Sequence, residues 1–554
     1  MNGHSASPPW WRGAVIYQIY PRSFRDTDGD GVGDLRGITG RLAYVRDLGV
    51  DAVWLSPFFP SPMKDFGYDV SDFRGVDPLF GTLADFDALV AEADRLGLAI
   101  IIDQVYSHTS DQHPWFRESA SSTVNPKADW YVWADPRPDG TPPNNWLSIF
   151  GGPSWTWSAA RQQYYLHNYL PSQPDLNLHN PEVQEELLAC AAFWLDRGVK
   201  GFRLDALHCA MHDRQLRDNP PRPRGGRDVV RPYDLQWHRY DHGQPEVALV
   251  LERFRQLTDR YGGTFTVAEV GADDPLPIMK DYTAEGRLQS AYSFQFLWAP
   301  RLTADHVRRT LSDWPGTGEA SWPSWAFSNH DAVRAVSRWQ VAVPLAQRAR
   351  LFALLMLSLR GNVFVYQGEE LGLPQADVPF DRLRDPEAIA NWPHTLGRDG
   401  ARTPMPWVCD DPHAGFASTE PWLPVDPAHH ALAVDRQHAD PDSVLSFFRK
   451  LIEFRRTSPA LRGGDLRLAD GGEGDILMFE RSADGEGLVA VFNLADRAGA
   501  VAVPEGGATL FSVGGASLSH GGLTLPPWSG ALVRLTPTQG SPIRPAAAQK
   551  GLSV

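Results

Sequence analysis

The chain has 554 residues and is 42% hydrophobic, so it is long enough for two or three domains with cores of their own. Its net charge of −15 argues against a nucleic-acid or anionic-membrane partner, and no run approaches the roughly 18 apolar residues of a membrane helix. The three cysteines, Cys190, Cys209 and Cys409, have no paired spacing, so we expect a cytoplasmic protein.

The first predicted strand, 14–19, is followed by the acidic segment DTDGDGVGDL at 26–35. Its aspartates have the spacing of EF-hand calcium ligands, but Gly37 stands where an EF-hand needs Glu, and the segment before it is strand-like. Carboxylates this close repel one another unless a cation compensates. We therefore expect one structural Ca²⁺ or Mg²⁺ that stiffens a loop, with an ion-free turn as the alternative.

Eight short runs of β-branched and aromatic residues recur, with room for a helix between each pair. Near-continuous apolar runs are typical of strands buried on both faces of a parallel sheet. Asn180 and Pro181 mark the start of one connecting helix, and Gly198 marks its end. The pattern predicts an α/β fold, a closed (β/α)₈ TIM barrel, with strands at 14–19, 50–57, 98–105, 200–206, 264–270, 290–294, 324–330 and 361–367.

Two further domains are predicted. A structureless loop as long as the third interval is improbable, so the segment reads as a small inserted domain. After a last helix at 443–457, short strands separated by turns predict a C-terminal antiparallel β-sandwich. The predicted boundaries are 1–103 and 173–463 for the barrel, 104–172 for the insertion, 464–537 for the sandwich, and 538–554 for a tail expected to be disordered. We also expect a mobile rim loop at 218–232.

Charged residues stand at the predicted C-terminal ends of several strands. Singly, each is explained by a helix cap or a salt bridge, but four strands that deliver charges to one rim indicate an active site, because barrel enzymes keep their sites there. These residues are Asp103, Arg203, Asp205, Glu269, His330 and Asp331.

Carboxylates around one pocket suit glycoside cleavage, in which a retaining enzyme needs two carboxyl groups about 5–5.5 Å apart. Arg203 lies on the same strand face as Asp205 and is expected to lower the pKa of that carboxyl. Glu269, in the apolar TVAEV, is expected to stay protonated as a general acid. Asp331 is suited to accept hydrogen bonds from sugar hydroxyls and to offset positive charge in the transition state. This chemistry needs no organic cofactor.

Five short segments, DQVYSH (103–108), QPDLN (173–177), GFRLDA (201–206), AEV (268–270) and FSNHD (327–331), resemble the ordered conserved regions of the α-amylase superfamily, glycoside hydrolase family 13. GRDGARTPMPW (397–407) and the N-terminal segment from Trp10 to Leu35 are similar to the α-glucosidase and oligo-1,6-glucosidase group. The likeness covers about residues 10–540 and is greatest to bacterial transglucosylating α-glucosidases.

The resemblance implies roles for individual residues. It makes Asp205 the nucleophile, Glu269 the acid/base and Asp331 the transition-state stabiliser. One departure is Ser107, where the family usually has Asn tied to a second calcium site, so we expect no second site. The resemblance further implies substrate binding by Asp65, Tyr68, His108, Phe150, Tyr169, Arg203, Ala206, His330 and Arg398, and metal binding by Asp26, Asp28, Asp30, Asp34 and the Val32 carbonyl. Within these sets, Asp65 and Arg398 close the pocket beyond the terminal glucose, and Ala206 matches α-1,4-acting members.

The predicted function is a retaining, exo-acting α-glucosidase, a monomer or homodimer, that hydrolyses α-1,4-linked glucose from maltose-like substrates and transfers it to sugar or alcohol acceptors. Alternatives are an α-1,6-preferring glucosidase and a sucrose or maltose isomerase. DRLRD (381–385) resembles an isomerase signature, but it follows the eighth strand, so we treat it as coincidence. A non-catalytic, membrane-anchored transporter subunit is disfavoured, since all three carboxylates are kept and no anchoring helix is seen.

Overall fold

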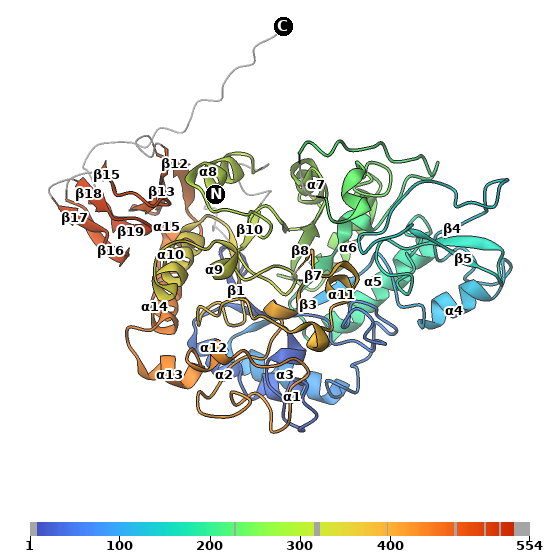
Figure 1. Cartoon of the computed structure of the whole chain (residues 1–554), viewed down its shortest axis with the longest axis horizontal. Helices are drawn as coiled ribbons and strands as arrows, with labels where there is room; N and C mark the ends of the chain where they lie inside the picture. Colours follow the sequence, from blue (N-terminus) through green and yellow to red (C-terminus); the bar gives the residue numbers. More distant parts are fainter. Residues whose placement is uncertain are drawn as a thin grey trace, which may run out of the picture.

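The computed structural model describes residues 8–226, 229–314, 322–395, 397–469, 474–503, 506–519 and 522–536. The tail predicted at 538–554 lies outside these ranges. Parallel strands close into a barrel in the order β1-β2-β3-β7-β8-β9-β10-β11 (Figure 1). They are β1 (Val15–Ile19), β2 (Ala52–Leu55), β3 (Ala99–Val105), β7 (Gly201–Asp205), β8 (Phe265–Val270), β9 (Ser290–Ser293), β10 (Trp322–Ala326) and β11 (Asn362–Tyr366).

All eight predicted strands are confirmed, with one shift. The seventh run was placed at 324–330, but β10 begins at Trp322 and ends at Ala326. Residues 327–330 have left the sheet, and this loop carries His330 and Asp331 to the rim of the barrel.

The strands are apolar on both faces because each face meets its own core. In β1, Ile16 joins an inner cluster with Trp54, Ile101 and Phe364, which fills the barrel. Its neighbours Val15, Tyr17 and Ile19 belong to the large outer cluster, which is packed against the helices. This explains the near-continuous apolar runs.

Helices surround the barrel. In α5 (Pro181–Asp196), the side chain of Asn180 accepts a hydrogen bond from the Glu182 amide, and Gly198 follows the helix with φ +92°, as its sequence predicts. The other helices before β11 are α1 (Leu35–Thr39), α2 (Leu42–Asp47), α3 (Leu83–Leu96), α6 (Val247–Asp259), α7 (Pro275–Tyr282), α8 (Ala304–Ser312), α9 (Ala335–Arg338) and α10 (Leu345–Ser358). After β11 come α11 (Pro386–Asn391), α12 (Pro427–His430), α13 (Val434–Ala439), α14 (Val444–Thr457) and α15 (Pro459–Arg462).

The long interval between β3 and β7 folds as predicted into structure of its own. It contains α4 (Pro114–Ser121) and an antiparallel sheet in the order β4-β6-β5, formed by β4 (Trp133–Ala134), β5 (Trp155–Ser158) and β6 (Gln163–Leu166). Val132, Trp146, Trp155 and Leu166 form a separate small core there.

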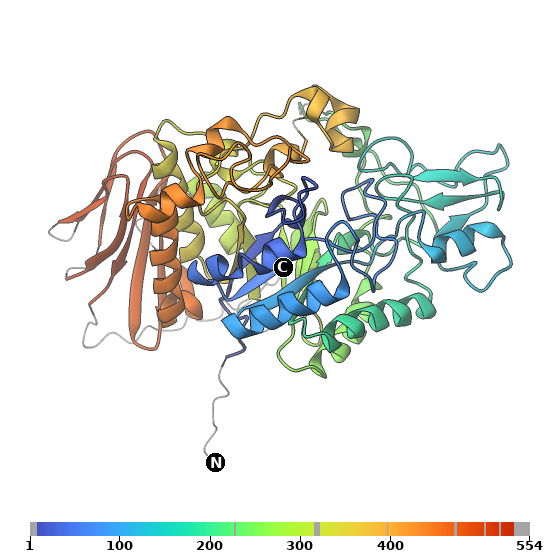
Figure 2. The same ribbon diagram turned by 90° about the horizontal axis from the view of Figure 1, so that it is seen from below.

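The C-terminal part contains two antiparallel sheets, in the orders β12-β13-β14-β19-β16 and β15-β18-β17. Figures 1 and 2 place it on the opposite side of the barrel from the insertion. Arg481 joins it to the barrel, since its buried guanidinium donates to the carbonyls of Ser358 and Leu461. The strands are β12 (Asp465–Leu468), β13 (Ile476–Ala483), β14 (Glu486–Asn493), β15 (Gly499–Ala502), β16 (Ala508–Val513), β17 (Ser517–Ser519), β18 (Gly522–Leu525) and β19 (Ser529–Arg534).

Candidate active site

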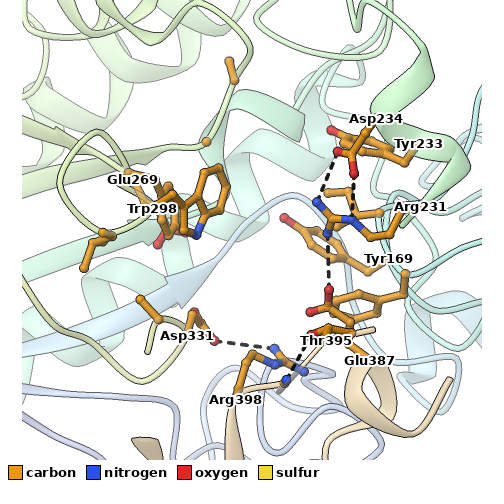
Figure 3. A pocket seen from close by; sticks show the side chains of 18 of the residues that line it. Tyr169, Arg231, Tyr233, Asp234, Glu269, Trp298, Asp331, Glu387, Thr395 and Arg398 are labelled. Carbon is orange, nitrogen blue, oxygen red and sulfur yellow. Dashed lines mark hydrogen bonds and ion pairs between the residues drawn. The ribbon is translucent and has the colours of Figure 1, made fainter. Parts of the chain in front are cut away.

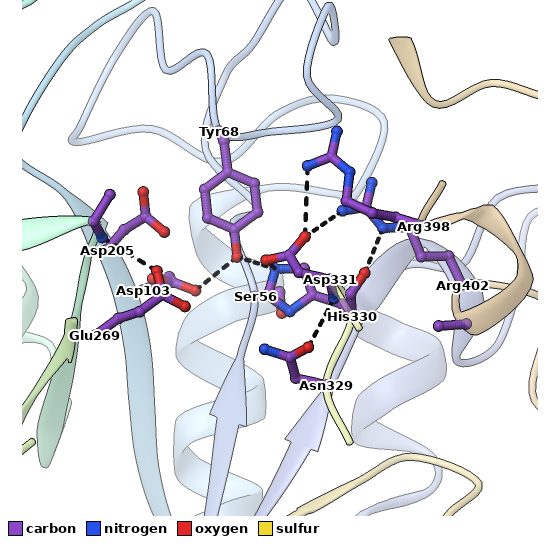
Figure 4. Close-up of polar contacts among 12 residues, drawn as sticks. Ser56, Tyr68, Asp103, Asp205, Glu269, Asn329, His330, Asp331, Arg398 and Arg402 are labelled. Carbon is purple, nitrogen blue, oxygen red and sulfur yellow. Dashed lines mark hydrogen bonds and ion pairs between the residues drawn. The ribbon is translucent and has the colours of Figure 1, made fainter. Parts of the chain in front are cut away.

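A buried guanidinium organises the centre of the site. Arg203, within β7, donates from Nη1 to Asp103 (2.7 Å) and to Asp205 (2.5 Å), and its Nη2 contacts Glu269. These groups come from the C-terminal ends of β3, β7 and β8, as predicted (Figure 4). Because one planar guanidinium touches Asp205 and Glu269, their carboxyl oxygens lie no more than about 7 Å apart, a range that includes the spacing of retaining enzymes.

Arg203 acts to lower the pKa of Asp205, as expected, but the expectation that this keeps the net pKa of Asp205 low is wrong. Burial, together with the negative charges of Glu269 and Asp103, raises the pKa of Asp205 well above its ordinary value, although Arg203 acts to lower it. The physical reason is that one positive charge is shared among three carboxylates, so none of them is fully compensated.

Glu269 also differs from expectation. The neighbouring Ala268 and Val270 are apolar and buried, but they belong to the outer cluster, on the face of β8 opposite to Glu269, whose carboxylate has polar partners. It contacts Arg203 and accepts a hydrogen bond of 2.8 Å from the Tyr292 hydroxyl. The apolar environment inferred from TVAEV is therefore wrong, since alternate residues of a strand face opposite sides.

Asp331 has a different electrostatic setting. Its Oδ1 accepts from Arg402 (2.7 Å) and Arg398 (3.5 Å), and its Oδ2 lies 3.0 Å from His330 Nε2 (Figure 4). Burial opposes ionisation, but His330, Arg402 and Arg398 hold the pKa of Asp331 well below its ordinary value. Asp331 is therefore a fixed negative charge on the cavity wall.

Tyr68, His108 and His330 lie around these carboxylates. The Tyr68 hydroxyl is 3.1 Å from Asp103 Oδ2 and 2.5 Å from His330 Nε2, and the two rings are stacked with centroids 5.4 Å apart. Burial lowers the pKa of His108 to about 4, so its imidazole is neutral at pH 7. A neutral imidazole can hydrogen-bond a sugar hydroxyl without adding charge.

The predicted pair of Asp65 and Arg398 is present. Arg398 Nη2 lies 2.9 Å from Asp65 Oδ1 and 2.7 Å from Asp385 Oδ1, and its guanidinium stands 5.2 Å from the centre of the Phe150 ring. Phe150 in turn packs against Tyr169 at 5.5 Å. The pair is thus held at one end of the site by both charge and aromatic contact.

A cavity of about 820 Å³ brings most of the predicted residues together. Arg203 and His330 lie beneath its wall. Ala206 is buried, is not among the residues that line the cavity, and has φ +41°. The predicted residues that line the cavity are Asp65, Tyr68, His108, Phe150, Tyr169, Asp205, Glu269, Asp331 and Arg398.

The loop after β7 reaches across the cavity rim. Arg231 contacts Asp234 at 3.2 Å and Glu387 of α11 at 3.4 Å (Figure 3). Arg222 contacts Asp273 at 2.6 Å. In its described residues the loop therefore contacts both neighbouring rim segments.

Sequence reasoning missed several contributors. Arg402 is in the same GRDGAR motif as Arg398, and Asp385 is the last residue of DRLRD. The sequence therefore showed these charged residues, but not which side chains they contact. Tyr292 gave no signal in the sequence. Trp298 lines the cavity, is 60% exposed, and stacks on Phe294 with ring centroids 4.2 Å apart, but its sequence context did not distinguish it from other aromatic residues (Figure 3).

Comparison with known proteins agrees with this geometry. The family description "Alpha amylase, catalytic domain" matches residues 18–464, and a domain of unknown function (DUF3459) matches 461–532. The chain belongs to the α-amylase family. This match confirms the predicted family, and with the closed barrel it confirms the predicted fold class.

Three α-amylase family relatives illustrate the similarity. A probable alpha-glucosidase of Rhizobium meliloti (strain 1021) is 54% identical over 503 residues, which cover 89% of this chain and 91% of that protein. The crystal structure of the alpha-glucosyl transfer enzyme XgtA has a TM-score of 0.91 at 51% identity, with 95% and 100% coverage. The trehalulose synthase MutB of Pseudomonas mesoacidophila MX-45 has a TM-score of 0.87 at 34% identity, with 96% and 100% coverage.

The acidic loop of this α-amylase family member follows β1 and a short turn, as predicted, and no EF-hand helix precedes it within the described residues. Carboxylate oxygens of Asp26, Asp28 and Asp34 lie within 4.8 Å of one another. Asp30 is not in this group, and its Oδ1 accepts from the Val32 amide at 2.7 Å. An all-oxygen donor set suits Ca²⁺ or Mg²⁺.

Across the described part of the chain, no helix is both long and apolar enough to span a membrane.

Proposed function

We propose that this glycoside hydrolase is a retaining, exo-acting α-glucosidase that removes terminal α-1,4-linked glucose from short substrates and transfers it to water or to sugar and alcohol acceptors. The observation that carries the proposal is the arrangement around Arg203. It holds Asp205 and Glu269 close together at the barrel rim, while Asp331 lines the same cavity.

In the first step, Asp205 attacks the anomeric carbon of the terminal glucose, and Glu269 donates a proton to the leaving glycosidic oxygen. The bond to the leaving sugar breaks as the glucosyl–Asp205 ester forms. In the second step, Glu269 takes a proton from water or another acceptor, whose oxygen attacks the same carbon and releases Asp205. Two inversions retain the α configuration. Asp331 offsets the positive charge of the oxocarbenium-like transition states.

Exo action is expected because a charged pair closes one end of the cavity. Asp65 and Arg398 form a charged pair that suits the hydroxyls at the non-reducing end of glucose, in particular the 4-hydroxyl. A further sugar unit attached there would have to displace this pair and Phe150, which packs against it. One terminal glucose per cleavage is therefore expected.

Transfer and chain length depend on the acceptor side. Arg231 and Glu387 form an ion pair and both line the cavity, so we infer that they narrow its acceptor side for long chains. The similarity to the alpha-glucosyl transfer enzyme XgtA supports transfer in addition to hydrolysis. The linkage preference is the finer part of the proposal. Because Ala206 does not line the cavity, its effect on linkage acts through the loop that it starts, and a bias of about 1–3 kcal/mol is the scale expected of one small side chain.

An isomerase is the second candidate, favoured by the similarity to the trehalulose synthase MutB. It shares the covalent step but returns the glucosyl group to the leaving fructose. Incubation with sucrose separates the two, because an isomerase yields mainly sucrose isomers, whereas the proposed enzyme yields free glucose and products of transfer.

For the metal, we propose one structural Ca²⁺ or Mg²⁺ held by Asp26, Asp28 and Asp34, with the Val32 carbonyl and Asp30 as the remaining candidates. When bound, the ion would neutralise these carboxylates and stiffen the loop. It takes no part in the reaction steps.

The mechanism is tested by the first anomer released. NMR of early products from maltose should show α-glucose, and Asp205→Ala should lose turnover while keeping its circular dichroism spectrum. Initial release of β-glucose would refute retention. Values of kcat/KM for maltose, isomaltose, sucrose and maltotetraose test the finer claims, because faster cleavage of isomaltose would refute the linkage preference, and equal cleavage of maltotetraose would refute the role of the rim loop.

A further inference from the structure

The two ends of the long connection between β7 and α6 meet beneath the wall of the active-site cavity. His208 and Cys209 lie in the short 3₁₀ helix just after β7, and His242 lies near the far end of the connection. The Gly243 amide donates to the His208 carbonyl at 2.7 Å, which joins the two ends. All three side chains are buried, each only 4% exposed.

The donor atoms of these three residues converge. One ligand atom from each of His208, Cys209 and His242 lies within 4.8 Å of the others. Nδ1 of His242 is 3.3 Å from the Tyr233 hydroxyl, whereas its buried Nε2 has no hydrogen-bond partner among the described residues. A buried polar atom without a partner is costly, so an unpartnered imidazole nitrogen in a group of metal-ligating side chains indicates a missing ligand.

We propose that His208, Cys209 and His242 form a binding site for a transition-metal ion, and two imidazoles and one thiolate are a donor set that suits Zn²⁺. Sulfur and nitrogen donors are those of protein zinc sites, and they differ from the oxygen donors of the acidic loop after β1. In a tetrahedral zinc site neighbouring donor atoms are about 3.3–3.6 Å apart, so the three side chains need to approach by at most about 1.5 Å.

The protonation states fit this use. Burial lowers the pKa of His208 to about 4 and that of His242 to about 3, so both imidazoles are neutral at pH 7, which is the form that binds metals. Burial raises the pKa of Cys209 well above its ordinary value, so the bound ion must displace the thiol proton. The thiolate and the nearby Asp241 carboxylate would balance the charge of the ion.

The neighbouring group of His238, Asp241 and His242 is a weaker candidate. Both ring nitrogens of His238 already have partners, because Nδ1 lies 2.8 Å from Asp241 and Nε2 lies 3.0 Å from the Tyr233 carbonyl. We therefore treat His238 and Asp241 as neighbours of the ligand His242 and not as ligands themselves. In His208, Nδ1 accepts from the Gly271 amide at 3.2 Å, so Nε2 is the nitrogen that would bind the ion. An ion at the proposed site would link Cys209 to His242, the two ends of the connection. Since His208 also lines the cavity, the ion would fix part of the wall.

Co²⁺ added to metal-free full-length protein is the direct test, because a cobalt–thiolate bond gives a charge-transfer absorption band that oxygen ligands do not give. We expect one equivalent of Co²⁺ to produce the band and one equivalent of Zn²⁺ to abolish it. The band should be absent in Cys209→Ser and reduced in His242→Gln. Cys190→Ser is the matched control, since Cys190 is equally buried in α5 but lies outside the cluster, and it should keep the full band.

Absence of the band in the wild-type protein overturns the proposal, and so does a band that persists in Cys209→Ser. The wild-type measurement does not depend on any variant, so misfolding of Cys209→Ser leaves the test intact. Elemental analysis provides a second readout, and a zinc content that is the same in the wild type and in a folded His242→Gln also overturns it.

Discussion

The ion pair of Asp65 and Arg398 offers a sharp test of exo action. Asp65 is 4% exposed, and its two carboxylate oxygens accept from Arg398 (2.9 Å) and from Gln173 (3.1 Å). Arg398 is independently held by Asp385 at 2.7 Å. Asp65→Asn therefore removes one charged acceptor from the cavity while the guanidinium keeps a partner.

The expected loss follows from the type of bond removed. A hydrogen bond to a charged group contributes about 1.5–3 kcal/mol, which corresponds to a decrease in kcat/KM of about 10–150-fold. The decrease should be seen with maltose and with p-nitrophenyl α-glucoside alike, because the lost contact is to the terminal glucose that both share. Asp111→Asn is the matched control, since Asp111 pairs with Lys64 in a partly exposed setting and should change kcat/KM little.

The assay compares p-nitrophenyl α-glucoside with its 4-deoxy analogue. In the wild type, removal of the 4-hydroxyl should lower kcat/KM by a similar factor of about 10–150. In Asp65→Asn the same removal should lower kcat/KM by a much smaller factor, because the Asp65 carboxylate that binds the hydroxyl is already absent. If removal of the 4-hydroxyl lowers kcat/KM by the same factor in the wild type and in Asp65→Asn, Asp65 does not bind this hydroxyl and the argument for exo action fails.

Three further predictions concern charge and stability. Burial and neighbouring carboxylates raise the pKa of Asp205, which must be ionised to attack, so kcat/KM should fall as the pH drops through this raised value. Asp103→Asn removes one of the charges that raise this pKa and should move the acidic limb of the pH profile to lower pH. An acidic limb at unchanged or higher pH in Asp103→Asn contradicts this. Chelation should lower the Tm of the wild type, Asp26→Asn should lower it without further response to chelator, and Asp30→Asn should retain the response; a wild-type Tm that ignores chelator argues against the ion. Arg481→Lys keeps the charge but loses the planar guanidinium that donates to several buried carbonyls, at a cost of about 1–3 kcal/mol for each carbonyl left without a donor. Urea unfolding should therefore show a lower free energy of unfolding, and an unchanged value would contradict the role of Arg481.

The barrel was predictable because its signals are local. Each strand is a short run that is apolar on both faces, and α5 begins at Asn180 and Pro181 and is followed by Gly198, so periodicity and capping determine the elements. The one shifted strand, β10, was misplaced because Phe327 and Ser328 are as strand-like in sequence as the residues before them. Its end depends on tertiary contacts of the following loop, which no local pattern encodes.

The environments of the site residues were less predictable than their positions. Chain order shows that Asp205 and Glu269 end adjacent strands, but it does not show that Arg203 contacts three carboxylates. It equally does not show that Ala206 has a positive φ and is absent from the residues that line the cavity. A pKa is set by all charges within a few ångströms, and most of these come from distant segments of the chain.

The charge balance around Arg203 explains why the pKa values of Asp103 and Asp205 are raised although both contact a guanidinium. With Asp103, Asp205 and Glu269 all ionised, the cluster would carry three negative charges against one positive charge, almost entirely out of contact with water. Such an imbalance is costly when buried, so the group as a whole retains a proton at a pH at which isolated carboxyls would have lost it. The raised pKa values of Asp103 and Asp205 express this shared demand. When the Asp205 carboxylate becomes an ester in the covalent step, one negative charge leaves the cluster and the demand for a proton falls. This loss of one negative charge accompanies the step in which, in the proposed mechanism, Glu269 acts as base toward the incoming acceptor.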